Sequence, residues 1–174
     1  MRAMVPDGAG SVIEADVPEP TTQPGEVLVQ VGAFSINRGE TFLLDRPAPG
    51  WRPGKDVAGT VLEGDRTVIV GQRVVAHPEN SGWAERVVVP IDRLAILPDD
   101  VDLCTAAALP LAGLTALRLT RVIGSLPGRS ILLTGASGGV RHYFVELVAA
   151  AGARVTALTS STTRGERLRE VGAD

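Results

Sequence analysis

Hydrophobic and polar residues alternate in short runs along the first hundred residues of the chain. The clearest run is Glu26–Val31, in which valines occupy every second position after the turn dipeptide Pro24-Gly25. Similar runs, each bounded by turn-forming residues, lie at Ser11–Val17, Val57–Leu62, Thr67–Val70, Arg73–Ala76 and Arg86–Val89. Short strands at this spacing predict a small antiparallel barrel or sandwich. We expect a short helix near Asn37–Leu44 and a loop over the proline- and glycine-rich stretch Asp45–Lys55.

Beyond residue 100 the pattern changes to alternating helix and strand. Apolar residues from Val140 to Ala151 recur at the spacing of one helix face, and short apolar runs at Ser130–Thr134 and Arg154–Leu158 flank this segment. A strand, a glycine-rich turn, a helix and a second strand form a βαβ unit. Further helices are predicted at Asp102–Ala108, Leu111–Ile123 and Arg164–Val171.

The distribution of proline marks the change between the two patterns. Eleven of the 12 prolines lie at or before Pro110. We therefore predict two domains, residues 1–110 and residues 111–174, in an α/β fold class with a β-rich part.

Composition and charge exclude several classes of protein. The chain has 44% hydrophobic residues and 17 basic against 20 acidic ones, which argues against nucleic-acid partners and anionic membrane surfaces. The single cysteine, Cys104, excludes a disulfide framework and a cysteine-based zinc cluster within one chain. No apolar run reaches the roughly 18 residues of a membrane span, and no secretory signal is visible. We expect a soluble, cytoplasmic protein whose partner is a small-molecule substrate.

The glycine-rich turn carries the chemistry. Gly135-Ala136-Ser137-Gly138-Gly139-Val140 lies between a buried strand and a helix, where backbone N–H groups and the helix dipole favour an anion such as a pyrophosphate. Arg141 stands where the dinucleotide-binding fingerprint has its third glycine. Its side chain could displace the helix, occupy the phosphate position or contact a phosphate, and the sequence leaves these alternatives open.

The end of the second predicted strand bears on the choice of cofactor. A NAD site usually has an acidic residue there, whereas this chain has Thr159-Ser160-Ser161-Thr162-Thr163-Arg164. Hydroxyls and an arginine suit a 2′-phosphate, so the site favours NADP. The alternative is a polar loop with a solvated arginine.

Several motifs in order resemble one family, the zinc-independent branch of the medium-chain dehydrogenase/reductases, which includes quinone oxidoreductases and enoyl reductases. They are Pro24–Val29, Ser35–Glu40, Pro53–Gly59, Gly82–Glu85, Ala106–Pro110, Gly113–Ala116, Gly135–Val140 and Val171–Asp174. The resemblance implies a GroES-like barrel followed by a linking helix and a partial Rossmann (βαβα) unit. It also implies NADPH as cofactor and hydride transfer to a quinone or an activated alkene.

The resemblance assigns roles to individual residues. Asn37 would line the active-site cleft, although an asparagine at this place is equally well a helix cap. Gly135, Ala136, Ser137, Gly138, Gly139 and Val140 would hold the pyrophosphate, and Ser160, Ser161 and Arg164 the 2′-phosphate. The zinc-binding residues of the alcohol dehydrogenase branch are missing from this chain. Ser35–Glu40 contains no cysteine, and Gly54-Lys55-Asp56 stands where that branch has Gly-His-Glu, so the resemblance implies no zinc.

Two departures keep other interpretations open. Arg141 is one, and the short Rossmann sheet, whose open edge predicts a homodimer or a partner chain, is the other. The alternative function is a redox-inactive, cofactor-free descendant that binds or cyclises a small apolar metabolite as a dimer. A third interpretation is a fragment without activity.

The local context of the remaining candidates indicates structural roles. His77 is interpreted as a surface or turn histidine, because no metal-ligand spacing surrounds it, and Cys104 as a small buried hydrophobe. Phe42, Trp51 and Trp83 are predicted to line a hydrophobic pocket, to pack in the barrel core or to anchor loops.

Overall fold

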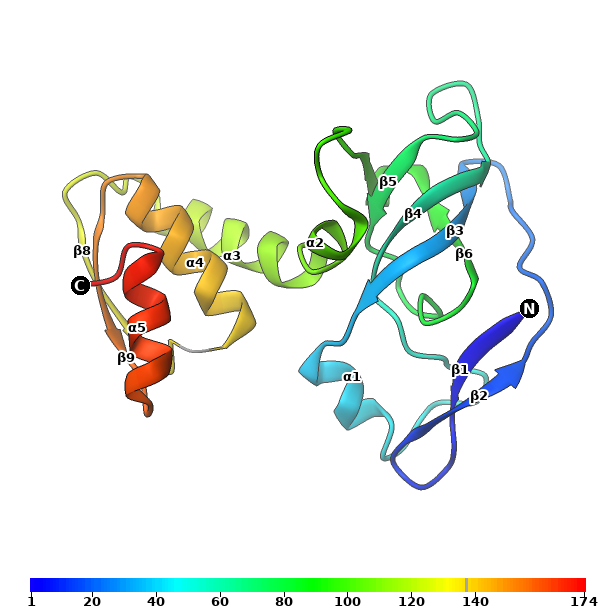
Figure 1. The fold of residues 1–174 in the computed structure, drawn as a ribbon, viewed down its shortest axis with the longest axis horizontal. Helices are drawn as coiled ribbons and strands as arrows, with labels where there is room; N and C mark the ends of the chain where they lie inside the picture. Colours follow the sequence, from blue (N-terminus) through cyan, green and yellow to red (C-terminus); the bar gives the residue numbers. More distant parts are fainter. Residues whose placement is uncertain (137) are drawn as a thin grey trace. The chain divides into compact units, whose positions relative to one another are not determined.

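The computed structural model describes residues 1–136 and 138–174. The chain divides into two compact units, Met1–Leu111 and Ala112–Asp174 (Figure 1). Each unit is described by itself.

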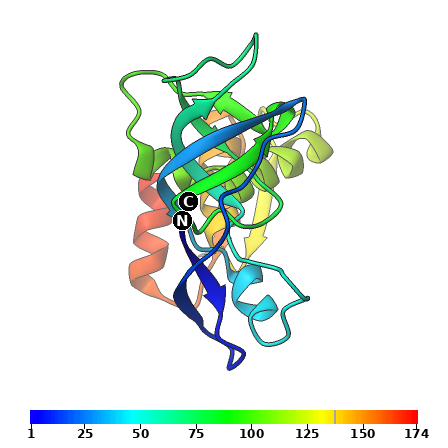
Figure 2. The same ribbon diagram turned by 90° about the vertical axis from the view of Figure 1, so that its right-hand side faces the viewer.

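The first unit is built around an antiparallel sheet. Its strands are β3 (Glu26–Ser35), β4 (Asp56–Glu63), β5 (Arg73–Ala76), β6 (Arg86–Pro90) and β7 (Leu94–Ile96), in the order β6-β3-β4-β5-β7. β1 (Arg2–Pro6) and β2 (Val12–Asp16) form a separate hairpin, joined to the β6 side by an isolated bridge between Ala3 and Ala84. Figure 2 shows how this sheet curls upon itself, as the barrel prediction requires. Short helices follow β3 and β7: α1 (Arg38–Leu43) and α2 (Leu103–Ala107), with a 3₁₀ turn, η1, at Ile91–Arg93.

Alternating valines explain why these segments form a sheet. Val27, Val29, Val57, Val74 and Val89 are fully buried and pack against one another inside the curl. Gly59 is required where β3 and β4 approach closely, because a Cβ built there would lie 2.0 Å from the carbonyl oxygen of Gln30.

Some predicted elements of this unit were wrong or missing. The predicted strand at Thr67–Val70 is a turn, because the backbone N–H groups of Thr67 and Val68 donate to Asp65 Oδ1 at 2.7 and 2.9 Å. These donors hold the pKa of the Asp65 carboxyl below its usual range. The strands β1 and β7 were not anticipated.

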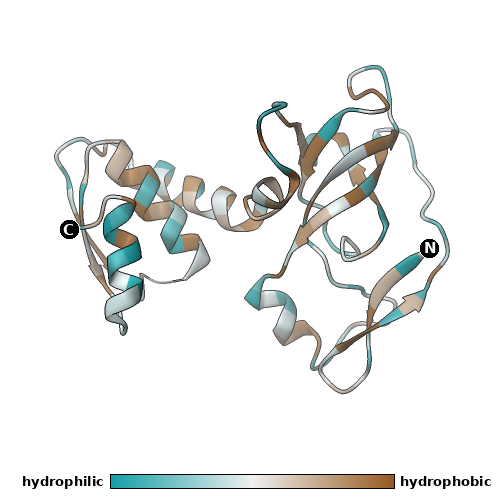
Figure 3. Cartoon of the chain, viewed as in Figure 1, coloured by the Kyte–Doolittle hydropathy of each residue, from teal (hydrophilic) through white to brown (hydrophobic). Residues whose placement is uncertain are grey.

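The second unit is a βαβα arrangement. β8 (Ser130–Thr134) and β9 (Arg154–Leu158) pair in parallel, joined by α4 (Gly139–Ala150), and α5 (Thr162–Glu170) follows. Both helices pack against β9, and α3 (Pro110–Ile123) contributes Ala116 to the same core. Figure 3 shows α5 as mostly hydrophilic; its buried anchor is Leu168. The predicted strands Ser130–Thr134 and Arg154–Leu158 are confirmed.

The sheet of the second unit has one covered and one open face. Ile131, Leu133 and Val155 pack into the core, whereas Leu132 and Leu158 on the opposite face are 70% and 60% exposed. After α5, Ala173 forms a parallel bridge with Val155 at the β9 edge. None of the helices in the described part of the chain combines the length and the apolar character that a membrane span requires.

Candidate functional site

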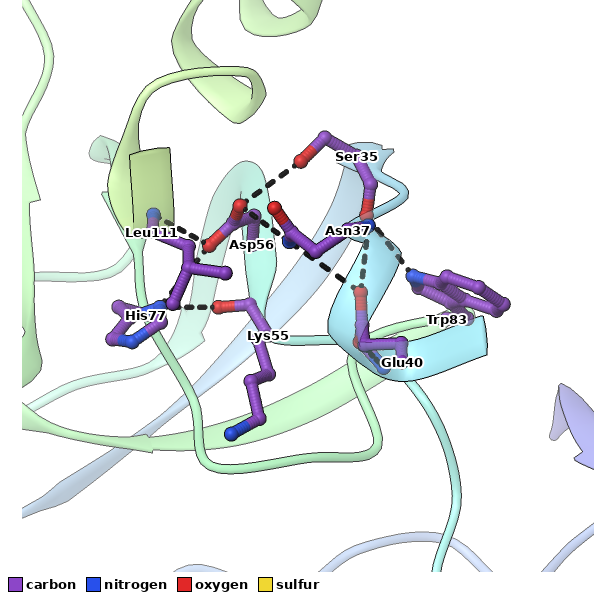
Figure 4. Close-up of polar contacts among 9 residues, drawn as sticks. Ser35, Asn37, Glu40, Lys55, Asp56, His77, Trp83 and Leu111 are labelled. Carbon is purple, nitrogen blue, oxygen red and sulfur yellow. Dashed lines mark hydrogen bonds and ion pairs between the residues drawn. The ribbon is translucent and has the colours of Figure 1, made fainter. Parts of the chain in front are cut away.

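A fully buried carboxylate, Asp56 at the start of β4, organises the polar site of the first unit (Figure 4). Oδ2 accepts hydrogen bonds from Ser35 Oγ at 3.0 Å and Asn37 Nδ2 at 2.8 Å. Oδ1 accepts from the Leu111 backbone N–H at 2.9 Å and faces Nδ1 of His77 at 3.1 Å. The Leu111 N–H belongs to the first turn of α3, where helices leave such donors unpaired, so Asp56 caps this helix from 55 positions earlier in the chain.

A second buried carboxylate, Glu40, fixes the start of α1. Its Oε2 accepts from the Asn37 backbone N–H at 3.0 Å and lies 3.4 Å from Asn37 Nδ2, and its Oε1 accepts from the Gly54 N–H at 2.6 Å. Asn37 therefore occupies the N-cap position while its side-chain amide faces Asp56 and Glu40. The Asn37 NH₂ group donates to both carboxylates, so the group of Asn37 that remains for a ligand is its side-chain carbonyl oxygen, an acceptor. Its assignment to substrate or nicotinamide stays a prediction.

Glycine is required at position 54, where the loop before β4 approaches the backbone at Trp83. Gly54 has φ +118°, and a Cβ built on it would lie 2.2 Å from the Trp83 backbone nitrogen. Trp83 is buried, stacks on Phe34 at 5.6 Å between ring centroids, and donates from Nε1 to the Ser35 carbonyl at 3.1 Å. The aromatic pair thus supports the segment that carries Ser35 and Asn37.

His77 belongs to this site, a role that its interpretation as a surface or turn histidine did not include. β4 and β5 pair with Val57 opposite Ala76, so the antiparallel register places Asp56 next to His77. His77 Nδ1 lies 2.8 Å from the Lys55 carbonyl oxygen as well as 3.1 Å from Asp56 Oδ1. Strand register, which local sequence spacing does not reveal, was the signal needed to find this contact.

The first unit also contains an apolar cavity of about 490 Å³. Phe34, Trp83 and Cys104 line it, together with the charged residues Arg2 and Glu85. Arg2 donates through its backbone N–H and guanidinium to Glu85, which holds the pKa of this carboxyl below its usual range.

Two of the predicted hydrophobic positions lie outside the core. Cys104 is exposed, so its assignment as a buried residue was wrong: α2 buries Ala106 and Ala107 instead. Phe42 is 61% exposed on α1, with the Arg38 guanidinium 5.4 Å above its ring.

The predicted pyrophosphate turn lies between β8 and α4 in the second unit. Gly135 has φ +59°, the buried Ala136 donates to the Leu158 carbonyl at 3.1 Å, Gly138 is the N-cap, and Gly139 and Val140 begin the helix. Ser137 lies outside the described residues.

Arg141 does not displace the helix from the sheet. Val145 and Val148 of α4 are fully buried, and the Arg141 side chain is directed to the exposed side of the turn, where Nη1 donates to the Gly135 carbonyl at 2.9 Å. A Cβ built on Gly135 or Gly138 would meet the Arg141 guanidinium at 3.3 to 3.5 Å, and one on Gly139 would meet open space. The guanidinium is thus the group that covers an otherwise open glycine backbone.

The predicted 2′-phosphate residues lie at the start of α5. Ser161 is its N-cap, and Ser160 and Arg164 are exposed. A cavity of about 170 Å³ beside them is lined by Thr159 and Thr162 and also by two carboxylates, Glu166 and Asp174, which the sequence reasoning missed.

The described residues contain no group of three or more His, Cys, Asp and Glu side chains placed to hold a metal ion.

The curled antiparallel barrel followed by a parallel βαβα unit defines a GroES-like domain joined to a Rossmann-type half, which confirms the predicted fold class. A family model of the alcohol dehydrogenase GroES-like domain matches residues 23–99. The chain is 38% identical over 187 aligned positions to the chloroplast envelope quinone oxidoreductase homolog of Arabidopsis thaliana, covering 96% of this chain and 56% of that protein. It is 32% identical to the quinone oxidoreductase of Mus musculus, covering 90% and 50%.

Solved structures show the same relationship. The quinone oxidoreductase of Pseudomonas syringae matches 99% of this chain and 57% of its own, with TM-score 0.89 and 29% identity. That of Thermus thermophilus, also solved with NADPH, matches 100% and 58%, with TM-score 0.88 and 30% identity. The chain belongs to the medium-chain dehydrogenase/reductase superfamily, among the relatives of quinone oxidoreductases, and it spans little more than half the length of these proteins.

Proposed function

We propose that this chain is part of an NADPH-dependent, zinc-independent oxidoreductase that transfers hydride to a quinone or a conjugated carbonyl compound. The observation that carries the proposal is the glycine backbone at the start of α4, which is open at Gly139 and covered at Gly135 and Gly138 by the Arg141 guanidinium. The relatives of this chain include quinone oxidoreductases and an NADPH-dependent alkenal/one oxidoreductase. NADPH, when bound, supplies the hydride.

The turn fits a pyrophosphate on two grounds. The Gly139 surface is open, and the first turn of α4 contains no acidic residue to repel a phosphate. Arg141 adds a guanidinium at the helix N-terminus, where a cation is unfavourable unless an anion joins it. We assign Arg141 to the pyrophosphate as a charged donor that supplements the backbone N–H groups.

The 2′-phosphate is assigned to the first turn of α5. Ser160 and Ser161 supply hydroxyls, and the exposed Arg164 supplies a positive charge.

Asn37 is assigned to orienting a ligand through its carbonyl oxygen. With its NH₂ group directed to Asp56 and Glu40, it suits a hydroxyl or amide N–H of the cofactor or substrate. Polarising a substrate carbonyl would need a donor, so that role falls to another group.

The open sheet face favours a partner. Leu132 and Leu158 lie exposed on a parallel sheet, and parallel sheets are normally covered on both faces. The homodimer or partner chain that the sequence predicts at the open edge of this sheet stays our proposal. Light scattering tests the homodimer, and a stable monomer at high concentration would contradict it. A cytoplasmic location likewise stays a proposal, since several relatives have chloroplast names.

A second candidate function is supported by the apolar cavity of about 490 Å³ in the first unit. Its size and its aromatic lining of Phe34 and Trp83 suit a small apolar metabolite without any cofactor.

Calorimetric titration of the chain with NADPH, and with NADH alongside, separates the two candidates. Micromolar binding of NADPH, weaker for NADH, is the expected result. If neither cofactor binds at millimolar concentration, the oxidoreductase proposal fails for this chain and apolar ligands become the compounds to screen.

A further inference from the structure

The two acceptors around His77 Nδ1 determine where the proton of its ring must lie. The Lys55 carbonyl oxygen at 2.8 Å cannot donate a hydrogen bond, and Asp56 Oδ1 at 3.1 Å already accepts one from the Leu111 N–H. Nδ1 therefore carries the hydrogen, and in the neutral ring the lone pair is on Nε2. The tautomer is set by this geometry, whatever the exposed edge of the ring contacts.

The remainder of the structure holds the ring in this orientation. Asp56 is fully buried and is itself fixed by Ser35, Asn37 and the Leu111 N–H. The His77 backbone N–H donates to the Arg93 carbonyl at 2.9 Å, which anchors the residue at the end of β5. The His77 side chain keeps 28% of its surface exposed, and Figure 4 shows its second nitrogen directed away from Asp56 and Lys55.

We propose that His77 is a proton carrier of this site, with Nε2 as the reactive atom and Asp56 as the positioning residue. A buried carboxylate on one nitrogen of a histidine orients the ring and stabilises its protonated form, which is how general acid–base pairs are built. The same carboxylate holds Asn37, so the proton carrier and the proposed ligand-orienting residue share one support.

The chemistry, which rests on the proposed function, needs one proton for each hydride. When a conjugated carbonyl accepts hydride from a reduced nicotinamide at its β-carbon, the alkene electron pair moves to give an enolate. The Nε2–H bond then breaks, its electron pair stays on nitrogen, and the proton goes to the enolate α-carbon; with a quinone it goes to the phenolate oxygen. Water returns a proton to Nε2.

Proton transfer can be tested without any cofactor. A ketone that meets Nε2 in D₂O loses an α-proton to the ring and regains a deuteron, so α-proton exchange of cyclohexanone, followed by NMR, reports the same step in both directions. The intact chain should accelerate this exchange over buffer. His77→Asn keeps an N–H near the Nδ1 position but deletes Nε2. The protein-catalysed rate of cyclohexanone exchange should therefore fall about 10²-fold in this variant, and by the same factor in His77→Ala.

The matched control is His142→Gln, because His142 is the second of the two histidines. It should exchange cyclohexanone at the wild-type rate, and it leaves a single histidine for ring ¹⁵N NMR, in which the neutral His77 ring should show protonated Nδ1. If His77→Asn retains full exchange, or only His77→Ala loses it, the role is structural and the proposal is overturned. A neutral ring protonated at Nε2 would also overturn it.

These outcomes are separable from those of the proposed function. Cyclohexanone exchange that depends on Nε2, in a chain that binds no NADPH, would leave His77 as an acid–base residue and reject the reductase. NADPH binding without any accelerated exchange would support the cofactor assignment and reject the proton carrier.

Discussion

Replacing Asp56 with asparagine is the sharpest test of the buried polar cluster. The amide keeps the shape of the carboxylate but offers one acceptor oxygen, and its NH₂ group would face either the Leu111 and His77 donors or the Ser35 and Asn37 donors. Two charge-assisted hydrogen bonds are lost in either orientation, and donors are left facing donors. At about 1.5–3 kcal/mol for each bond to a charged group, partly offset by removal of a buried charge, we expect unfolding to become easier by about 3–5 kcal/mol.

Urea unfolding followed by tryptophan fluorescence measures this change in the barrel. Both tryptophans, Trp51 and Trp83, lie in the first unit, so their signal reports on that unit. With a denaturant slope of about 2 kcal/mol per molar, the midpoint should fall by about 2 M.

Ser35→Ala is the matched control, since it removes one neutral donor to the same carboxylate. It should cost about 1.5–3 kcal/mol, the value of one bond to a charged group, which is about 1 M in midpoint. If Asp56→Asn shifts the midpoint no further than Ser35→Ala does, the four hydrogen bonds drawn to Asp56 among the described residues do not hold the barrel as described.

Other substitutions test the sheet, the cofactor assignment and the acid sensitivity. Gly59→Ala should cost at least about 2 kcal/mol in urea unfolding, because its Cβ meets the Gln30 backbone, and an unchanged midpoint would refute the close approach of the strands. In calorimetric titrations Arg164→Gln should weaken NADPH about tenfold and leave NADH unchanged, whereas Arg141→Gln should weaken both; tighter binding by Arg141→Gln would identify that arginine as an obstruction. The Thr105 hydroxyl and N–H lower the pKa of the Asp102 carboxyl in the folded chain. The carboxylate therefore adds to stability above its unfolded-state pKa, and this contribution disappears as the pH falls through its folded-state pKa. Asp102→Asn should make stability depend less on pH over this acidic range, as measured by urea unfolding at a series of pH values.

The sequence predicted elements well where a local pattern decides the structure. Ser130–Thr134 and Arg154–Leu158 were placed correctly because each is a short apolar run between turn signals. Thr67–Val70 has the composition of a strand, but the side chain of Asp65 captures its N–H groups, and such competition is not visible in hydrophobic alternation. β7 has only three residues, too few for any periodicity.

The polar site was harder to predict, because it depends on contacts between distant segments. Asn37 was singled out by resemblance, yet its two carboxylate partners, Asp56 and Glu40, were not, since buried acids are exceptions to the usual pattern. His77 reaches Asp56 only through the pairing of β4 with β5. Conversely, Cys104 was assigned to the core from residue type alone, and the orientation of α2 decided otherwise.

The buried carboxylates have a consequence for backbone dynamics. The N–H of Gly54 lies in a loop and that of Leu111 in the first turn of a helix, positions where amide hydrogens usually exchange with solvent quickly. Here each is donated to a carboxylate that is 1% exposed or less. In hydrogen–deuterium exchange these two isolated amides should therefore be protected to the same degree as those of the central strands. Slowly exchanging amides should then mark the polar site as well as the sheet.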